Sequence, residues 1–229
     1  MCGRYTLTAP DPARIRMRFP VGESVELRPR FNVAPGDGVL AVTTDREGRP
    51  RGELLRWGLV PPWSKAGEAT LKMINARAET LEERPAYREG FRRFRCLIIA
   101  DGFYEWRRAQ GGQSQPFHIT RPGGEPFAFA GLWSVWREEE TTVRSCTIIT
   151  TEARGPVAAL HDRMPVILPA AAEDDWLAPG CGRERLLALV GSSEASAATL
   201  RPVSTAVNDA RHDAPDCLAE PDSIQPALF

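Results

Sequence analysis

Proline and glycine recur along the whole chain and limit the length of any regular element. The 229 residues include 20 prolines and 19 glycines, and the apolar segments between them are short. Proline fixes φ and removes a backbone donor, and glycine favours turns, so long helices are disfavoured. With 42% hydrophobic residues, the chain is long enough to bury one sizeable core or two small ones. We therefore expect short strands joined by tight turns.

The apolar segments have the β-branched and aromatic content of strands, and many are continuous rather than alternating. The expected strands lie within residues 2–8, 39–45, 53–60, 94–106, 116–121, 126–136, 145–151 and 164–169. Helices are expected at 11–19, at 80–94 with a disturbance at Pro85, at 170–177 and at 183–190. These elements predict an α+β fold: a β-rich single domain of barrel-like sheets with peripheral helices.

The last stretch, 209–229, differs in composition from the rest. It contains three prolines and five acidic residues and has little apolar periodicity. Such a segment buries little apolar surface. The sequence therefore predicts a domain over residues 2–208 and a flexible acidic C-terminal tail over 209–229.

Charge and cysteine usage exclude several classes of protein. The net charge is −1, so any nucleic-acid binding must use a local patch. The five cysteines have no metal-ligand spacing, and their odd number does not indicate a disulfide framework. No apolar run reaches membrane-spanning length, and no signal pattern precedes the first strand. We expect a cytoplasmic monomer with no metal, cofactor or membrane contact.

Cys2 has two nucleophiles once the initiator methionine is removed, and the small residue Gly3 after it permits that removal. The α-amine and the thiol have ordinary pKa values of roughly 8 and 8.5, so both react near neutral pH. The amine forms an imine with an aldehyde, and the thiol then closes a thiazolidine ring. The alternative is an ordinary cysteine at a frayed end. The strand expected at 2–8 favours an anchored terminus.

Glu105 and Asn75 are polar residues in apolar or structured surroundings. Glu105 follows a strand and lies among aromatic residues, where burial would raise its pKa toward general acid–base use. The alternative is a surface glutamate that faces away from the sheet. Asn75 offers an amide for a sugar oxygen, or it is a turn or capping residue before the next helix.

Basic and imidazole groups supply the remaining polar candidates. Arg77 shares a strand face with Asn75 and would hold a phosphate, unless it forms an ion pair with Glu79 or another acid. His161 lies between a loop and a strand, where a histidine is either structural or a proton shuttle. Arg163 is a second phosphate candidate.

Three further positions have a structural and a binding interpretation. Trp63 follows two prolines and offers either a core contact or a stacking face for a nucleobase. Pro35 lies in a turn and would wedge against a base if it is exposed. Thr150 either donates a hydroxyl hydrogen bond to a nucleic-acid backbone or simply ends a strand.

Seven short blocks, in this order and combination, resemble the SRAP family, the SOS response-associated peptidases that are also described as abasic-site processing proteins. The blocks are Met1-Cys2-Gly3-Arg4, Asn32-Val33-Ala34-Pro35, Trp57-Gly58-Leu59-Val60-Pro61, Asn75-Ala76-Arg77-Ala78-Glu79-Thr80, Gly102-Phe103-Tyr104-Glu105-Trp106, Ala130-Gly131-Leu132-Trp133 and His161-Asp162-Arg163-Met164-Pro165. The resemblance extends from residue 2 to about residue 208 and leaves the acidic tail outside.

The resemblance implies the SRAP fold and a role for each candidate. Cys2 would form a thiazolidine cross-link with an abasic site in single-stranded DNA, and so shield the site during the DNA damage response. Asn75 would hold the sugar, Glu105 would act as the acid–base group, and His161 would stabilise the open sugar. The implied DNA contacts are Arg4, Arg77, Arg163 and Thr150 on the backbone, with Trp63 and Pro35 against bases. Association with the nucleoid after damage, a lyase side reaction and self-processing are further implications.

Two other functions remain open at this stage. An N-terminal-nucleophile cysteine peptidase would use the same four residues, Cys2, Asn75, Glu105 and His161. Since only Met1 precedes Cys2, little propeptide is available for cleavage. A non-catalytic single-stranded DNA binder would lose nothing measurable when Cys2 is replaced by alanine.

Overall fold

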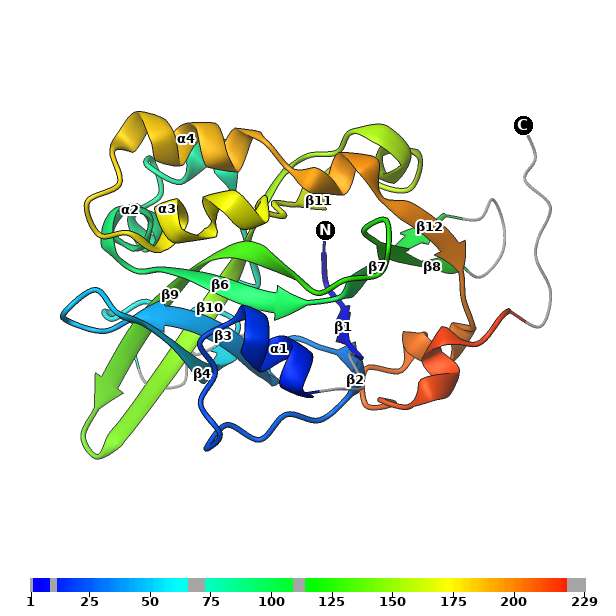
Figure 1. Cartoon of the computed structure of the whole chain (residues 1–229), viewed down its shortest axis with the longest axis horizontal. Coiled ribbons are helices and arrows are strands. Elements are labelled where there is room, and N and C mark those ends of the chain that lie inside the picture. The colour runs from blue at the N-terminus through cyan, green and yellow to red at the C-terminus, as the bar shows by residue number, and fades with distance from the viewer. Residues whose placement is uncertain (1, 9–11, 66–72, 109–113, 222–229) are drawn as a thin grey trace.

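A closed barrel forms the centre of the molecule (Figure 1). The computed structural model describes residues 2–8, 12–65, 73–108 and 114–221. The barrel strands are β3 (Gly38–Thr44), β4 (Pro50–Trp57), β6 (Arg95–Ala100), β9 (Phe127–Glu138) and β10 (Thr141–Glu152). The ring closes because β10 pairs with both β4 and β9. Two short strands, β5 (Asn75–Arg77) and β11 (Arg163–Pro165), pair with the end of β10.

A second sheet stands beside the barrel and contains the N-terminal strand. Its order is β12 (Thr199–Pro202), β8 (Gln115–Thr120), β7 (Gly102–Arg107), β1 (Tyr5–Leu7) and β2 (Arg30–Val33). The chain passes from the barrel to this sheet at Asp101, between β6 and β7. The single segment expected over 94–106 is therefore two strands in two different sheets.

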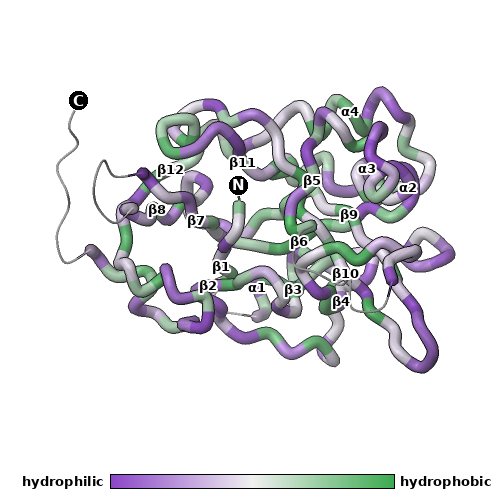
Figure 2. Tube along the Cα trace, turned by 180° about the vertical axis from the view of Figure 1, so that it is seen from behind, coloured by the Kyte–Doolittle hydropathy of each residue, from purple (hydrophilic) through white to green (hydrophobic). Residues whose placement is uncertain are grey.

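Both faces of the barrel strands are covered, as the continuous apolar runs predicted. All six residues of β6 are buried. Cys96 and Ile98 belong to the cluster inside the barrel, while Leu97 and Ile99 pack outward with the residues of the helices. Figure 2 shows hydrophobic residues along the central strands and hydrophilic residues in the hairpin between β9 and β10. The predicted α+β, barrel-like single domain is confirmed.

The peripheral helices are α1 (Pro12–Arg18), α2 (Pro85–Arg93), α3 (Glu173–Leu177) and α4 (Arg183–Gly191). Three agree with the expected ranges, with a 3-10 turn at Ala170–Ala172 ahead of α3. The expectation of one helix over 80–94 is wrong. A 3-10 turn covers Ala78–Thr80, and α2 begins at Pro85. Proline lacks the N–H that a continuous helix would need there, but it suits a first turn.

The C-terminal segment 209–221 packs against the second sheet, which corrects the expectation of a loose tail for these residues. Cys217 is buried in a cluster with Tyr104, Val203 and Val207. The carboxylate of Asp213 accepts hydrogen bonds from the backbone N–H groups of Phe31 and Asn32 at 2.6 and 2.9 Å. A short polar segment is ordered here because it satisfies the exposed edge of β2. Residues 222–229 lie outside the described part of the chain.

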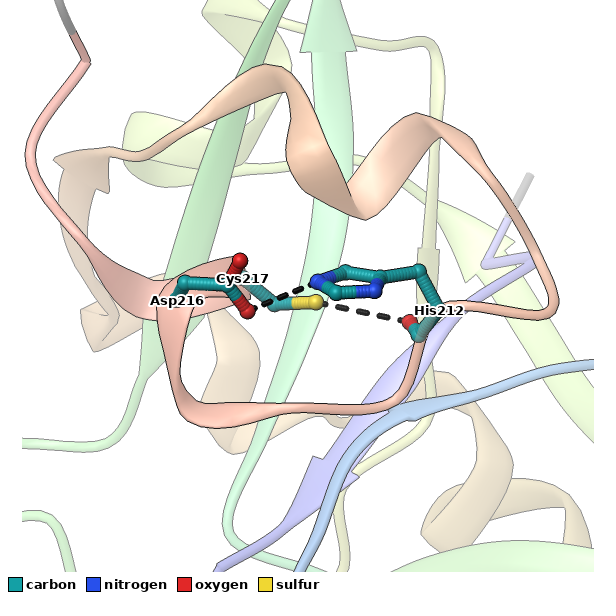
Figure 3. Close-up of side chains that lie close together, drawn as sticks. All are labelled: His212, Asp216 and Cys217. Atoms are coloured by element: carbon teal, nitrogen blue, oxygen red, sulfur yellow. Dashed lines mark hydrogen bonds and ion pairs between the residues drawn. The ribbon is translucent and has the colours of Figure 1, made fainter.

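His212, Asp216 and Cys217 lie close together on this segment (Figure 3), with potential metal-ligating atoms within 4.8 Å of one another. His212 Nε2 lies 2.7 Å from Asp216 Oδ1, and the Cys217 thiol donates to the carbonyl of His212 at 3.5 Å. The side chains of His212 and Asp216 thus pair with each other, and the Cys217 thiol bonds the backbone of His212, which closes the turn that returns the chain to the sheet.

Among the described helices, none has the length and apolar character to cross a membrane.

Candidate functional site

Cys2 is a buried residue held at the junction of the two sheets. Strand β1 pairs with β7 through Tyr5 and Phe103, and the N–H of Tyr104 donates to the carbonyl of Arg4 at 3.0 Å. Because the strands are antiparallel, the chain continues from Arg4 to Cys2 alongside Glu105. Cys2 has no exposed surface and belongs to the cluster that fills the barrel. It is not a residue of a frayed end.

Asn75 holds the backbone of Cys2 from the neighbouring sheet. Its Nδ2 donates to the carbonyl oxygen of Cys2 at 2.9 Å. The residue lies on β5, which is fixed by parallel pairing with β10 at Ile148. The other amide atom, Oδ1, is buried and has no hydrogen-bond partner among the described residues. The site therefore contains a positioned acceptor beside Cys2, ready for an N–H or O–H donor of a ligand.

Glu105 lies on β7 and is buried rather than exposed, with 3% of its surface accessible. Burial raises its pKa to about 7, because water no longer solvates the charged form. Burial also raises the pKa of the Cys2 thiol above its ordinary value, and the negative charge of Glu105 raises it further. The two groups are thus in electrostatic contact, with a protonated thiol beside a carboxyl that gains or loses its proton near neutral pH.

His161 follows the 3-10 turn Gly155–Ala159 and precedes β11. Its Nδ1 lies 2.9 Å from the N–H of Arg163 and 2.6 Å from a carboxylate oxygen of Asp162. These contacts need opposite protonation states of Nδ1. Burial lowers the pKa of His161 below its ordinary value, which favours the neutral ring at neutral pH. The backbone N–H of Arg163 is always a donor, so when the neutral ring accepts it at Nδ1, Nε2 bears the proton. The charge of Asp162 adds to the raised pKa of Glu105, which places this loop beside the same site.

An open pocket of about 480 Å³ adjoins Asn75. Its lining residues are Trp63, Met73, Asn75, Arg77, Thr80, Arg84, Pro85, Ala86 and Tyr87. Trp63 is 61% exposed, which excludes the core interpretation for that side chain. Arg77 is exposed on β5 and forms no ion pair with a described acid, since Glu79 pairs with Arg163. An aromatic face and an exposed guanidinium thus stand next to the residue that contacts Cys2.

The remaining candidates lie outside this pocket and are engaged with the protein. Arg163 donates to both carboxylate oxygens of Glu79 at 3.0 and 2.8 Å, and to the carbonyl of Thr150 at 2.7 Å. Arg4 donates to Asn32 Oδ1 at 2.9 Å and to the carbonyl of Val207 at 2.6 Å. Thr150 is buried on β10, and Pro35 is half-buried in a turn. Their contacts with DNA stay predictions.

Sequence reasoning missed the contribution of α2 to this pocket. The Tyr87 hydroxyl donates to the carbonyl of Asn75 at 3.2 Å, and Arg84 lines the same wall. The available signal was the basic and aromatic run Arg84-Pro85-Ala86-Tyr87, with a proline suited to a helix start. Nothing in the sequence indicates that this helix start faces β5.

The fold and the sequence both have known relatives. The family model described as SOS response associated peptidase (SRAP) matches residues 1–210. The chain is 40% identical over 225 residues to the abasic site processing protein YoaM of Bacillus subtilis, covering 95% of this chain and 97% of that protein. It is 30% identical to the abasic site processing protein HMCES of Xenopus tropicalis, covering 96% of this chain and 78% of that one.

Solved structures agree with this relationship. A protein from Bacteroides thetaiotaomicron superposes with a TM-score of 0.81 over 96% of this chain and 99% of its own, at 23% identity, which shows the shared fold. A phage-related protein from Bordetella bronchiseptica superposes with a TM-score of 0.71 over 89% of this chain and 95% of its own, at 28% identity. By sequence and by fold, the chain belongs to the SOS response associated peptidase (SRAP) family.

Proposed function

We propose that this protein senses abasic sites in single-stranded DNA and becomes covalently attached to them through Cys2. One observation carries the proposal: Asn75 holds the backbone of a buried Cys2 beside Glu105, a buried carboxyl whose pKa is about 7. The names of the relatives at 40% and 30% identity, abasic site processing proteins, support the choice of substrate. The proposal requires that Met1 is removed, because only then does Cys2 have a free amine.

The proposed reaction joins the aldehyde of the open abasic sugar to both nucleophiles of Cys2. The amine attacks the aldehyde carbon, and the carbinolamine oxygen leaves as water after Glu105 donates a proton. Loss of water leaves a protonated imine that keeps one N–H. The thiol gives its proton to the Glu105 carboxylate, and its sulfur adds to the imine carbon, so that the nitrogen of the closed ring is neutral. His161, with its proton on Nε2, donates to a hydroxyl of the open sugar. Proton transfer of this kind contributes roughly 10²–10⁴-fold per group.

Strand binding in this proposal begins at the pocket beside Asn75. Arg77 would hold a flanking phosphate, and the exposed ring of Trp63 would stack on a base. Arg163 would exchange Glu79 for a phosphate, while Arg4, Thr150 and Pro35 complete the proposed contacts. Phosphate contacts depend on charge and are the same for every base. The affinity for DNA would therefore depend on the salt concentration and hardly on the base sequence.

The product shields a site that is otherwise prone to strand cleavage, which suits a role in the DNA damage response. If the thiol fails to trap the imine, loss of a proton from the adjacent sugar carbon eliminates the 3′ phosphate. That outcome is a lyase reaction. A Cys2→Ser variant retains the amine without the thiol and is expected to favour it.

The test is a denaturing gel of purified protein mixed with a single-stranded oligonucleotide that has one abasic site. The wild type should give a heat-stable, slowly migrating species, and Cys2→Ala should give none while it retains most of its non-covalent binding. Cys181→Ser, at a partly exposed cysteine on another surface, is the matched control and should behave as the wild type. Absence of the adduct with wild-type protein free of Met1 contradicts the proposal.

The family description also names a peptidase, and a thiol beside a carboxyl suits an N-terminal nucleophile. In this second candidate function the physiological substrate is a peptide bond, including the one after Met1. A panel of peptide substrates separates the two functions, because turnover without DNA supports the hydrolase. A plain single-strand binder would instead bind intact strands and leave no covalent product.

A further inference from the structure

A second group of buried polar residues links β1 to the strands beside it. The Thr6 hydroxyl lies 2.6 Å from Asp101 Oδ1 and 3.0 Å from His118 Nε2. Thr6, Asp101 and His118 have 0%, 6% and 7% of their surface exposed. They come from β1, from the link between β6 and β7, and from β8. None of the three belongs to the pocket or to the groups assigned above to the reaction.

The number of protons on each group decides which group donates and which accepts in these hydrogen bonds. A threonine hydroxyl has one proton, which it donates to the Asp101 carboxylate, so it accepts from a proton on His118 Nε2. Burial lowers the pKa of His118 to about 4, and the charge of Arg201 on β12 lowers it further. The ring of Tyr104 on β7 lies 5.2 Å away, centroid to centroid. His118 is therefore neutral at neutral pH, with Nε2 as its donor.

Gly102 makes this bridge possible. The sheet order places β7 between β8 and β1, so the His118 side chain has to cross β7 to reach Thr6. A Cβ at position 102 would lie 2.1 Å from His118 Nε2 and 2.9 Å from Thr6 Oγ1. Because glycine has no side chain, the imidazole of His118 can cross β7 at this position.

The bridge matters because the ladder between β1 and β7 is short. Only the pairs Tyr5 with Phe103 and Thr6 with Gly102 are formed between the named strands. A slip by one residue would turn every side chain of β1 to the opposite face. Asp101 strengthens the observed register, since Oδ2 also accepts from the backbone N–H of Thr8 at 2.5 Å.

We propose that Thr6, Asp101 and His118 are positioning residues that fix the register of β1 against β7, and thereby place Cys2 against Glu105. Cys2 lies four residues before Thr6, and Glu105 three residues after Gly102, so an error at the bridge displaces the two reacting groups relative to each other. This inference rests on the proposed cross-linking function. None of the three residues contacts the sugar in this proposal.

The test replaces Thr6 by valine, which retains the shape and removes the hydroxyl, and by serine, which restores the hydroxyl. The rate of adduct formation with abasic single-stranded DNA should fall about tenfold or more in Thr6→Val, since small misplacements cost that much. Affinity for the intact strand should not change. The ¹³C NMR titration of the Glu105 carboxyl should shift in Thr6→Val and return to the wild-type position in Thr6→Ser.

Thr8→Val is the matched control, because it removes only the hydroxyl hydrogen bond to Asp101 Oδ2 at 2.8 Å. The backbone bond of Thr8 to the same carboxylate and the bridge to His118 remain. This variant should retain the wild-type rate and the wild-type Glu105 titration. If Thr6→Val does not fold, His118→Asn is used instead, since the shorter side chain cannot span β7. It should show the same loss of rate.

The outcomes separate this inference from the proposed function. A Thr6→Val protein with lower thermal stability but unchanged rate and unchanged Glu105 titration overturns the positioning role. If the wild type forms no adduct, the proposed function fails. The Glu105 titration then decides the positioning role alone: a shift in Thr6→Val that Thr6→Ser reverses supports it, and identical titrations reject it.

Discussion

At the scale of single residues, burial favours the protonated forms of both the Cys2 thiol and the Glu105 carboxyl. The pKa of the Cys2 thiol is raised, and the pKa of Glu105 reaches about 7. Reactive cysteines commonly have lowered pKa values and a stored thiolate. Here the thiol is stored as a neutral group and needs a base at the moment of reaction. A buried neutral thiol is also protected from adventitious oxidation.

Replacing Glu105 by glutamine removes the proposed base and acid while the shape of the side chain remains. The adduct rate of the wild type should change between about pH 6 and 8, around the Glu105 pKa of about 7. In Glu105→Gln the rate should fall about 10²-fold at neutral pH, and the inflection should disappear. Rates measured across this range on one oligonucleotide test the expectation. A retained inflection would assign it to another group.

The same shift predicts how stability depends on pH. The folded pKa of Glu105, about 7, lies above its unfolded value, so this group loses stabilising effect as pH rises from about 4.5 to 7. The folded pKa of His118, about 4, lies below its unfolded value, so its contribution rises with pH between about 4 and 6.5. Each slope is about 1.4 kcal/mol per pH unit, with opposite signs.

Glu105 and His118 change the stability with pH in opposite directions. Removing the Glu105 carboxyl should therefore reveal the contribution of His118. The free energy of unfolding of Glu105→Gln, measured by urea denaturation, should rise more steeply between pH 4.5 and 6.5 than that of the wild type. It should also exceed the wild-type value at pH 8. Equal slopes for the two proteins would show that Glu105 titrates at its ordinary pKa in the folded state.

At the scale of elements, the short strand β5 joins the reactive residue to the proposed strand-binding surface. Its parallel pairing with β10 fixes Asn75 against Cys2 and directs Arg77 to the pocket. Three residues are enough because alternate side chains of a strand share a face. One backbone segment thereby sets both the proposed chemistry at one end and the proposed phosphate binding at the other.

Arg77→Gln should weaken non-covalent binding to single-stranded DNA uniformly across sequences. Loss of one phosphate contact should also reduce the slope of log affinity against log salt by about 0.7. Arg137, an exposed arginine at the far end of the β9–β10 hairpin, provides the control as Arg137→Gln. Fluorescence anisotropy over a salt series measures both slopes. Equal losses for the two variants would indicate a diffuse charge effect.

The sequence predicts the elements better than it predicts their neighbours. The continuous apolar runs predicted that both faces of the barrel strands are covered. Pro85 predicted a disturbance of the helix, and α2 begins at this proline. The sequence left Glu105 undecided between core and surface, because burial depends on the sheet that packs above it. It also missed Tyr87 and Arg84, since their approach to β5 is a tertiary contact. The sequence indicates Asn75 as a candidate, but its hydrogen bond to Cys2 depends on the pairing of β5 with β10.

At the scale of the whole molecule, the C-terminal segment closes the second sheet from outside. Arg4, on the same short segment as Cys2, donates to the carbonyl of Val207, and Asn32 Nδ2 donates to the carbonyl of His212 at 2.7 Å. Burial alone would raise the pKa of Asp213, but the hydrogen bonds from Arg30 and from the backbone of Phe31 and Asn32, with the charge of Arg30, together outweigh it and hold this pKa below its ordinary value. The two ends of the chain therefore stabilise each other around β2.

Asp213→Ala should lower the free energy of unfolding by about 2 kcal/mol, because two backbone donors of β2 lose their acceptor. Since the pKa of Asp213 is lowered in the folded state, its contribution should be present at neutral pH and lost under acid conditions. Asp216→Ala loses an exposed contact with His212 and should cost much less. Chemical denaturation at pH 7 and under acid conditions compares the two variants, and equal losses would contradict the expectation.

In the proposed reaction, the amine and thiol of Cys2 together capture the open abasic sugar. The decisive measurement is intact-mass analysis of the protein after incubation with an abasic oligonucleotide, followed by digestion and sequencing of the modified peptide. The expected product is a chain without Met1, increased by the mass of the DNA less one water, with the modification on Cys2 at both nitrogen and sulfur. Attachment at another residue, or an unmodified Cys2 with its amine free, would contradict it.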